Sequence, residues 1–322
     1  MKAAVLYALG ELPRYADFME PEAAQDEALV RVKAASLKRF DRMMAGGTHY
    51  DRYSVLPVVC GIDGVGLLED GRRVFCGGPR PPFGMMAERT VVSRVRCMPV
   101  PDDISDEIAA ALPNPALSSW LPLVWRAQLK KGETVLILGA TGVAGKLAIQ
   151  IAKHLGAGRV VAAGRNRDTL TSLHELGADA TISLDLPDRE VRDAFLQEAK
   201  LSHFDVVLDY LWGHPTELLL DALTGHDTLA VSGRIRFIEI GDVAGPAVSL
   251  RGEVLRSSGI EFYGSGGGGI VPPRAIFEAI PQVWSLAALG KLRIDIVEIP
   301  LADVAKAWAQ GDARGRRIIL LP

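Results

Sequence analysis

Three glycines at intervals of three residues are the feature of this sequence that most directly implies chemistry. Gly139, Gly142 and Gly145 lie where an apolar strand predicted over 134–138 passes into a helix predicted over 143–155. The first glycine permits a tight turn, the second lets a pyrophosphate approach backbone N–H groups, and the third lets the helix pack closely on the strand. The positive end of the helix dipole then faces the phosphates. The alternative, a tight turn without a ligand, does not require all three.

We therefore predict a dinucleotide-binding site at this turn. Its residues are Gly139, Ala140, Thr141, Gly142, Val143, Ala144 and Gly145.

The residues after the next predicted strand, over 159–163, distinguish between the two nicotinamide dinucleotides. A site that prefers NAD usually places Asp or Glu about 20 residues after the glycines, where it binds the ribose 2′-hydroxyl. Here Gly164 leaves room, and the forked guanidinium of Arg165 suits a 2′-phosphate. Asn166 can donate to the same oxygens, and Arg167 adds positive charge. Unless these are merely solvated loop residues, we expect NADPH to be preferred over NADH.

The elements that must position these residues follow a repeated pattern. Apolar strands are predicted over 134–138, 159–163, 181–184, 205–211, 234–240 and 260–263, with amphipathic helices between them. Repeated β-α units predict a parallel, doubly wound sheet. The first third of the chain is instead rich in short strands, predicted over 1–6, 28–35, 57–68, 73–76 and 87–92. Such spacing is typical of a small barrel or sandwich.

Composition excludes several classes of protein. The 322 residues are 48% apolar and carry a formal net charge of −3, which argues against a disordered chain and offers no basic surface to nucleic acid. No run reaches the roughly 18 apolar residues of a membrane helix, and the N-terminus lacks the pattern of a signal peptide. The three cysteines are an odd number without metal-ligand spacing. We expect a soluble cytoplasmic protein with reduced thiols.

The order of its segments resembles the medium-chain dehydrogenase/reductase superfamily, in its zinc-free quinone-oxidoreductase-like branch. The matching segments cover nearly the whole chain and include MKAAV, AASLKRFDRMMAGGTHY, PVVCGIDGVG, LPNPALSSWLPL, KKGETVLILGATGVAG and GRRIILLP. The resemblance implies an α/β fold with a GroES-like β-barrel catalytic domain and a Rossmann domain with a doubly wound parallel sheet. It implies a catalytic domain over 1–115, completed by 271–322, and a dinucleotide-binding domain over 116–270.

The same resemblance argues against zinc. Zinc-containing members carry a Cys three residues before an Asp, and a Gly-His-Glu motif. Here Lys38 stands three residues before Asp41, residues 61–63 read Gly-Ile-Asp, and Asn114 aligns with a third ligand position. Lys, Ile and an amide do not form a zinc site of the usual nitrogen and sulfur ligands. We expect no metal.

Without zinc, the resemblance implies NADPH-dependent hydride transfer to a quinone or an α,β-unsaturated carbonyl. Tyr50 matches a Gly-x-Tyr region of the branch, although the segment is one residue longer here. Its phenol could donate to a developing enolate or quinol oxygen; the alternative is a packed aromatic on a loop. Lys38 could stabilise the same oxyanion, or form a salt bridge with Asp41 or Asp63. Tyr50 and Lys38 are the candidate catalytic residues.

The resemblance also implies further cofactor contacts. Ile240 and Gly241 end a predicted strand and are expected near the nicotinamide ribose. Gly264 and Ser265 begin a glycine-rich loop expected to cover the nicotinamide. Arg316, near the C-terminus, is expected to reach the cofactor.

Two other functions are compatible with the sequence, and the resemblance also implies an oligomeric state. The chain could be an NADPH-binding regulatory or scaffold protein without turnover, or a reductase of ketones or enoyl thioesters. The resemblance implies a small-molecule substrate, no nucleic acid or membrane partner, and a homodimer formed through the strand predicted over 260–263.

Overall fold

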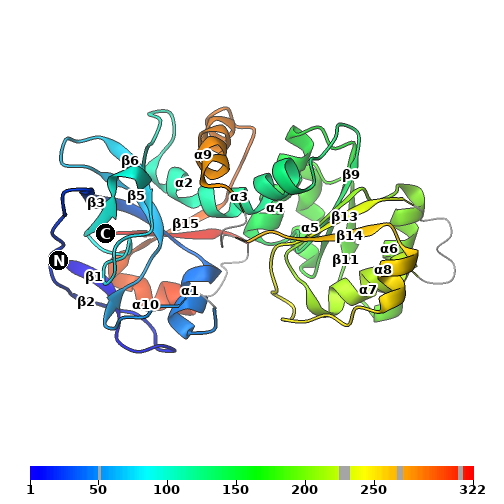
Figure 1. Ribbon diagram of the computed structural model, residues 1–322, viewed down its shortest axis with the longest axis horizontal. Coiled ribbons are helices and arrows are strands. Elements are labelled where there is room, and N and C mark those ends of the chain that lie inside the picture. Colours follow the sequence, from blue (N-terminus) through cyan, green and yellow to red (C-terminus); the bar gives the residue numbers. More distant parts are fainter. Residues whose placement is uncertain (50–51, 225–232, 267–270, 311–314) are drawn as a thin grey trace. The chain divides into compact units, whose positions relative to one another are not determined.

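The computed structural model describes residues 1–49, 52–224, 233–266, 271–310 and 315–322. The chain divides into two compact units, one of Met1–Pro113 with Ile294–Pro322 and the other of Asn114–Arg293. Both termini belong to the first unit, so the chain leaves this unit and returns to it (Figure 1). The predicted chain order is the same, with a central dinucleotide-binding segment between two parts of the first domain.

The division differs from the predicted domain bounds over residues 271–293. The prediction assigns these residues to the first domain, whereas they belong to the second unit. Gln150 ties the end of this segment down, because its amide donates to the carbonyl oxygen of Arg293 at 3.0 Å and accepts from the Arg293 N–H at 2.8 Å. Such side-chain contacts over a long sequence separation are not visible in the local pattern.

A parallel sheet is the centre of the second unit. Its described strands are β9 (Thr134–Leu138), β10 (Arg159–Gly164), β11 (Ala180–Ser183), β12 (Val206–Asp209), β13 (Ile235–Glu239) and β14 (Ile260–Gly264). They pair in the order β11-β10-β9-β12-β13-β14, every pair parallel. Every residue of β9 is buried, as expected of a strand covered on both faces. The predicted doubly wound sheet is confirmed.

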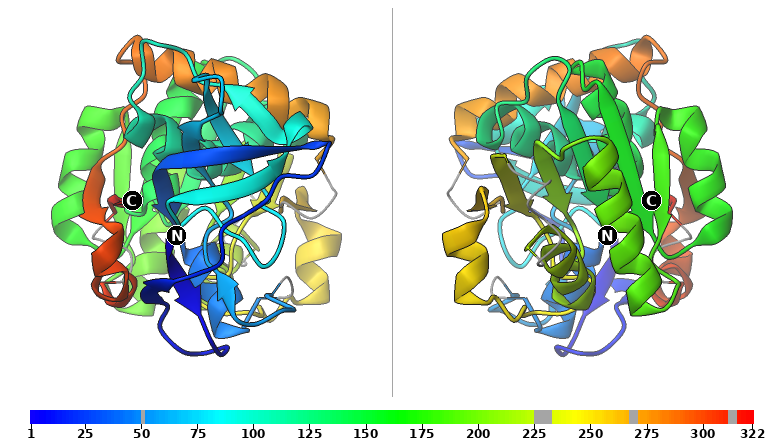
Figure 2. Two further views of the ribbon diagram at one scale, coloured as in Figure 1. Left: turned by 90° about the vertical axis from the view of Figure 1, so that its left-hand side faces the viewer. Right: turned by 90° about the vertical axis from the view of Figure 1, so that its right-hand side faces the viewer.

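Helices connect the strands of this sheet and cover its faces. They are α4 (Val143–His154), α5 (Arg167–Ser172), η3 (Leu173–Leu176), α6 (Asp188–Leu201), α7 (Gly213–Thr224) and α8 (Gly252–Ser257). Two further helices, α3 (Pro113–Leu121) and η2 (Pro122–Arg126), precede β9, and α9 (Pro273–Ala288) follows β14. Apolar residues of α6, α7 and α8 share one core cluster with alternate strand residues such as Leu136 and Val207. Helix α4 lies on the other side of the sheet (Figure 1). The right-hand view of Figure 2 shows helices beside the green strands of this unit.

The first unit is built from antiparallel strands with a short parallel edge. Its strands are β1 (Lys2–Leu6), β2 (Arg14–Asp17), β3 (Glu27–Leu37), β4 (Val58–Val59), β5 (Asp63–Leu67), β6 (Arg73–Gly77), β7 (Arg89–Ser93), β8 (Cys97–Pro99), β15 (Ile296–Pro300) and β16 (Arg317–Leu321). One described sheet has the order β2-β1-β4, and the other has the order β15-β16-β3-β5-β6-β8 with β7 paired to β3. The C-terminal strand β16 therefore completes the sheet begun by β3.

Short helices complete this unit. They are α1 (Arg39–Gly46), η1 (Arg94–Arg96), α2 (Asp106–Ala111), η5 (Leu301–Asp303) and α10 (Val304–Ala309). In the described part of the chain, no helix is long and apolar enough to cross a bilayer.

Some elements depart from the sequence prediction. Helices α3 and α9 both begin at a proline, Pro113 and Pro273. Proline is tolerated in the first turn of a helix, because the N–H that it lacks has no intrahelical partner there. Helix α1 and strand β8 are absent from the prediction. Helix α1 is short and begins where Asp41 accepts a hydrogen bond from the Lys38 N–H at 2.8 Å.

Candidate functional site

The predicted glycine turn joins β9 to α4 with the expected backbone. Gly139 has a φ of +89°, a left-handed conformation that favours glycine. The Gly139 and Ala140 N–H groups both donate to the Ala163 carbonyl at 2.9 Å, which anchors the turn to β10. A Cβ at Gly145 would lie 2.5 Å from the Cα of Ala140, so this glycine is required by the approach of α4 to the turn.

Gly142 differs from Gly139 and Gly145, because no described residue comes close enough to require glycine there. Its φ is −80°, and a Cβ there would meet only the carbonyl oxygen of Gly139, at an ordinary 3.5 Å. The residue is exposed. The space that a side chain would fill is therefore open toward solvent, as a site for a pyrophosphate needs.

The start of α4 offers uncompensated donors at this position. Gly142 is the N-cap and has no side chain with which to cap the helix, and α4 has no acidic residue in its first turn. The first bond of the helix runs from the Lys146 N–H to the Gly142 carbonyl at 2.9 Å. The N–H groups of Val143, Ala144 and Gly145 precede it and have no acceptor within the helix. These amides fit an anion, and the residues present therefore fit a dinucleotide.

The topology brings the other predicted contacts of this unit to the same edge of the sheet. Strands β10 and β12 flank β9, so the strand order reverses at this point, and ligands of such sheets bind outside the carboxyl ends of the strands there. Gly164, Ile240 and Gly264 all lie at carboxyl ends of parallel strands. The Ile240 and Gly241 N–H groups donate to the Asp209 carbonyl at 2.8 and 3.2 Å.

Asp209, the last residue of β12, holds the turn beside this point. It is fully buried, and its Oδ1 accepts from the N–H groups of Leu211 at 2.8 Å and Trp212 at 3.0 Å. Its Oδ2 accepts from the Thr216 hydroxyl at 2.5 Å. Burial raises the pKa of Asp209, against these hydrogen bonds, which lower it. Trp212 has a φ of +53°, uncommon for a bulky residue, so this carboxyl group supports a strained turn.

Tyr210 links this turn to two helices. Its hydroxyl lies 2.8 Å from Ser119 Oγ and donates to the Ser118 carbonyl of α3 at 3.1 Å. Ser119 Oγ also lies 3.2 Å from the Ala144 carbonyl oxygen in the first turn of α4. A Cβ at Gly139 would lie 3.2 Å from Tyr210 Cβ. Tyr210 therefore packs under the glycine turn and helps to fix it. Sequence reasoning missed both Asp209 and Tyr210, although they end a strand that it predicted.

Acidic groups also lie at this edge. Glu239, the last residue of β13, is half-buried, and burial raises its pKa, with smaller contributions from Asp209 and Asp242. The Glu239 carbonyl accepts from the Ser265 N–H at 2.8 Å, which places the start of the loop after β14. The carboxyl groups at this edge therefore stay protonated, and uncharged, up to a higher pH than ordinary carboxyl groups.

The residues predicted to bind a 2′-phosphate follow β10, and their contacts differ. Arg165 is exposed and makes no ion pair with another described residue. Arg167 instead donates to the Asp185 carbonyl at 2.8 Å, and Asn166 Oδ1 accepts from the Thr169 N–H at 3.0 Å to cap α5. Arg165 is therefore the guanidinium best able to bind an anion here.

Gly164 has a reason to be glycine that the sequence did not show. A Cβ at this residue would lie 2.6 Å from Cγ2 of Thr141, inside the glycine turn. The prediction explains Gly164 only by the room that it leaves for a phosphate. The close approach of Thr141 is a second and sufficient reason.

In the first unit, Lys38 lies in a buried ion cluster. Its side chain is 1% exposed. The ammonium donates to the Ser36 carbonyl and hydroxyl at 2.9 Å each and to Asp63 Oδ1 at 2.7 Å, and it lies 3.4 Å from Asp41 Oδ2. An ammonium has three protons, and these three acceptors use all of them. The salt bridges predicted as the alternative for Lys38 are present, and no proton is left for a substrate oxygen.

Asp41 is the member of this cluster whose carboxyl group has the fewest hydrogen bonds among the described residues. It is fully buried, and its Oδ1 has no hydrogen-bond partner among the described residues. Burial raises the pKa of Asp41 and the Asp63 charge adds to the rise, whereas Lys38 opposes it. Cys60 and Tyr53 lie nearby, and burial raises the pKa of both, with a further contribution from Asp41. One ammonium thus faces two carboxyl groups, and burial favours a proton on Asp41.

These residues do not fit a catalytic zinc ion. The positions aligned with zinc ligands hold Lys38, Ile62 and Asn114. An ammonium bonded to Asp63 cannot coordinate a metal, and Ile has no donor atom. Within the described ranges, no group of three His, Cys, Asp or Glu side chains is arranged to hold a metal ion.

Three predicted residues lie either outside the unit that contains the glycine turn or outside the described residues. Tyr50 lies outside the described residues. Lys38 and Arg316 belong to the first unit, where Arg316 is an exposed residue beside β16. Their proposed parts in the reaction therefore remain predictions.

Comparison with known proteins agrees with this geometry. Residues 143–285 match the family model of the zinc-binding dehydrogenases. A probable NADPH-dependent quinone reductase of Emericella nidulans is 27% identical, over 96% of each chain. The quinone oxidoreductase of Thermus thermophilus, whose NADPH complex is also known, is 29% identical over the whole of both chains with a TM-score of 0.81. These similarities over the whole chain are to oxidoreductases of the medium-chain dehydrogenase/reductase type.

Two further similar proteins are a quinone oxidoreductase and an alkenal/one oxidoreductase. The quinone oxidoreductase of Pseudomonas syringae is 26% identical over both whole chains, with a TM-score of 0.85. An NADPH-dependent alkenal/one oxidoreductase of Arabidopsis thaliana is 32% identical, but over only 52% of this chain and 49% of its own length. The family model named for zinc covers only residues of the second unit, so it does not include Lys38 or Ile62.

Proposed function

We propose that this protein is an NADPH-dependent oxidoreductase that transfers hydride to a quinone or an α,β-unsaturated carbonyl without a metal ion. The observation that carries the proposal is the open position at Gly142, at the uncapped start of α4, with the exposed Arg165 beyond the neighbouring strand. Relatives named as NADPH-dependent quinone and alkenal/one reductases support the same reaction class.

The chain's own groups would bind the dinucleotide along the edge of the sheet. The N–H groups of Val143 and Ala144 would hold the pyrophosphate, and Arg165 would pair with the 2′-phosphate in forked geometry. Ile240, Gly241, Gly264 and Ser265 would border the nicotinamide end, and Arg316 would add a positive charge. When bound, NADPH supplies a hydride from C4 of its dihydronicotinamide.

The absence of fitting metal ligands favours acceptors that do not need a Lewis acid. Quinones and conjugated enones take hydride at an electron-poor carbon and spread the resulting charge onto an oxygen. We propose that the Tyr50 phenol donates a proton to that oxygen. Because all three protons of the Lys38 ammonium are engaged by Ser36 and Asp63, we assign Lys38 a positioning role rather than that of a donor.

The decisive experiment measures NADPH oxidation by chelator-treated protein against quinones, enones and simple ketones, with NADH in parallel. We expect turnover of quinones or enones, with NADPH preferred. Tight NADPH binding without turnover of any acceptor would contradict an enzymatic function. Turnover that appears only after zinc is added would contradict a metal-independent reaction.

Three variants test the cofactor site. Gly142→Asp places a carboxylate against the pyrophosphate, and we expect it to abolish NADPH binding while the fold survives, because the position is open. Arg165→Ala should weaken NADPH binding about tenfold or more and leave NADH binding unchanged, since one charged pair is worth about 1.5–3 kcal/mol. Arg167→Ala is the matched control, because Arg167 is already engaged by Asp185. Equal losses from both arginine variants would argue against Arg165 as the 2′-phosphate ligand.

We also propose a homodimer formed through β14. This strand is last in the described order of its sheet, so its outer edge can pair with a second copy across a two-fold axis. Light scattering should then give about twice the 34.6 kDa of one chain. A monomer at micromolar concentration would contradict this assembly.

A further inference from the structure

Two cysteines face each other on neighbouring strands of the first unit. Cys76 in β6 is the direct register partner of Cys97 in β8, and their sulfur atoms lie 3.8 Å apart. Both are free thiols. Their separation of 21 positions conceals this pairing in the sequence, where the cysteines suggested only isolated reduced thiols.

The register of the two strands allows a disulfide bond to form between these sulfur atoms. The Val100 N–H donates to the Arg73 carbonyl at 3.1 Å, which makes this a hydrogen-bonded pair of the antiparallel ladder. Such pairs alternate with non-hydrogen-bonded pairs, so Cys76 and Cys97, three positions along, form a non-hydrogen-bonded pair. The Cα atoms of such pairs lie about 4.5 Å apart, at the short end of the roughly 4.4–6.8 Å that disulfides span. A bridge is therefore possible by side-chain rotation.

The surroundings of the two thiols are unequal. Cys76 is fully buried in the apolar core, whereas Cys97 is partly exposed and packs against that core. The pKa of Cys97 is lowered by its contact with Cys76 and by the charges of Arg94 and Arg72, while the same contact and burial raise the pKa of Cys76. The more accessible sulfur is thus also the one more readily ionised, as an attacking thiol must be.

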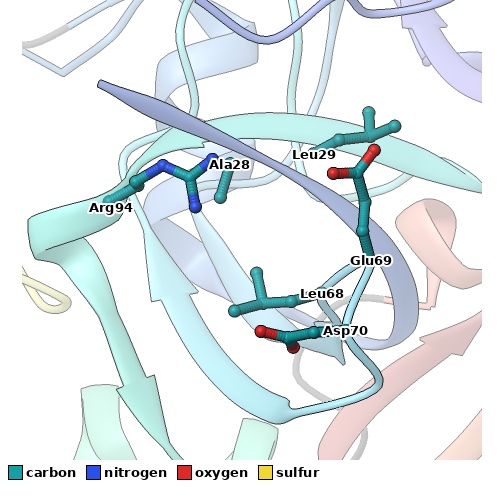
Figure 3. Close-up of a pocket in the computed structure, with 6 residues that line it drawn as sticks. All are labelled: Ala28, Leu29, Leu68, Glu69, Asp70 and Arg94. Carbon is teal, nitrogen blue, oxygen red and sulfur yellow. The ribbon is translucent and has the colours of Figure 1, made fainter. Parts of the chain in front are cut away.

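Arg94, whose charge lowers the pKa of Cys97, lies at the protein surface. Its exposed side chain lines a pocket of about 110 Å³. Figure 3 shows its guanidinium on the opposite side of this pocket from the carboxyl groups of Glu69 and Asp70. The other residues that line the pocket are Ala28, Leu29 and Leu68. The positive charge near Cys97 is therefore carried by a solvent-accessible group.

We propose that Cys97 and Cys76 are a reversible redox pair that reacts with low-molecular-weight disulfides. The Cys97 thiolate attacks one sulfur of the disulfide, which forms a mixed disulfide and releases one thiolate. The Cys76 thiol then attacks Cys97 Sγ, passes its proton to the departing second thiolate and forms the Cys76–Cys97 bond. The two protein thiols are oxidised, the small disulfide is reduced to two thiols, and the reaction reverses with excess dithiol.

The test exposes the full-length protein to oxidised glutathione, followed by alkylation under denaturing conditions and intact mass measurement. We expect two of the three cysteines to be lost to alkylation, no glutathione to remain attached, and dithiothreitol to restore all three. Peptide mapping of the same wild-type sample should join the peptides of Cys76 and Cys97. Cys60 should remain alkylatable, because it is fully buried and burial raises its pKa.

Two variants separate the roles of the sulfurs. Cys76→Ser should trap one glutathione stably on Cys97, because the resolving thiol is missing. Cys97→Ser should prevent both the adduct and the bridge. The proposal is overturned if wild-type protein keeps a stable glutathione adduct without a bridge, if Cys60 takes part in the bond, or if all three cysteines stay reduced. Mapping of the wild type decides the question even if a serine variant does not fold.

Discussion

At the scale of single residues, the three glycines of the turn are glycines for different reasons. Gly139 needs its left-handed backbone, and Gly145 needs room against Ala140. Gly142 needs neither, since its φ is −80° and its Cβ position is open. A glycine that the fold does not require points to a ligand that does.

This difference predicts opposite results for two alanine variants. Gly145→Ala should lower the free energy of unfolding by about 1–3 kcal/mol, because its methyl group meets backbone atoms. Gly142→Ala should change it by less than about 0.5 kcal/mol, as for an open surface position, yet weaken NADPH binding. Urea unfolding and NADPH titration of both variants check this. A stable Gly145→Ala protein would show that α4 does not approach the turn as closely as described.

Lys38 supplies a second prediction at this scale. Removing its ammonium leaves the carboxyl groups of Asp41 and Asp63 buried without a counter-charge. Lys38→Met should therefore cost about 3–5 kcal/mol of unfolding free energy. The matched control adds Asp41→Asn and Asp63→Asn to the same chain, which should recover most of the loss. A small effect of Lys38→Met alone, measured by urea unfolding, would contradict the buried pairing.

Asp41 makes stability depend on pH with a definite sign. Burial raises its pKa in the folded state, whereas an unfolded Asp titrates near about 3.9. Between these two values the folded state binds more protons than the unfolded state, so the contribution of Asp41 to the free energy of unfolding falls as pH rises. Asp41→Asn removes this contribution. The free energy of unfolding of the variant should therefore rise relative to that of the wild type as pH increases between the two pKa values. A difference between the two proteins that stays constant with pH would contradict it.

At the scale of secondary-structure elements, the carboxyl ends of the parallel strands carry the site. The ends of β12 and β13 are joined by the bonds from Ile240 and Gly241 to the Asp209 carbonyl. Tyr210 ties the end of β12 to α3, and Ser119 of α3 bonds to the first turn of α4. The glycine turn is thus rigid because three elements meet beneath it, and rigidity lowers the entropic cost of binding.

Asp209 provides the test at this scale. Asp209→Ala leaves the Leu211 and Trp212 N–H groups and the Thr216 hydroxyl without their acceptor. We expect a loss of about 3 kcal/mol or more in unfolding free energy, since each unsatisfied buried group costs roughly 1–3 kcal/mol. Asp209→Asn retains a carbonyl oxygen for the turn and should lose less. Thermal and urea unfolding compare the two, and equal losses would argue against the hydrogen bonds as the cause.

At the scale of the whole molecule, cofactor and metal should have different effects on stability. NADPH at 100 times its Kd should raise the free energy of unfolding by about 2.7 kcal/mol, by preferential binding to the folded state. Chelator treatment should leave both the melting temperature and the activity unchanged, because an ammonium paired with Asp63 takes the place of a ligand cysteine. Differential scanning calorimetry measures both effects. A lower melting temperature after chelation would reveal a structural metal.

The division of the chain also belongs to this scale. The alternating strands and helices were predictable, because each element carries a local hydrophobic period and the glycine turn has a fixed local spacing. The assignment of 271–293 to the second unit was not, because it depends on contacts such as that of Gln150 with Arg293, which lie 143 residues apart.

The sequence by itself determined the parallel sheet, the glycine turn and the family, since these depend on short-range pattern. Only the tertiary structure decided that the Lys38 ammonium donates its hydrogen bonds to Ser36 and Asp63, and that Cys76 faces Cys97. Both results depend on how distant strands of one sheet are paired. A one-residue shift in pairing would turn these side chains to opposite faces, and no local pattern fixes that register.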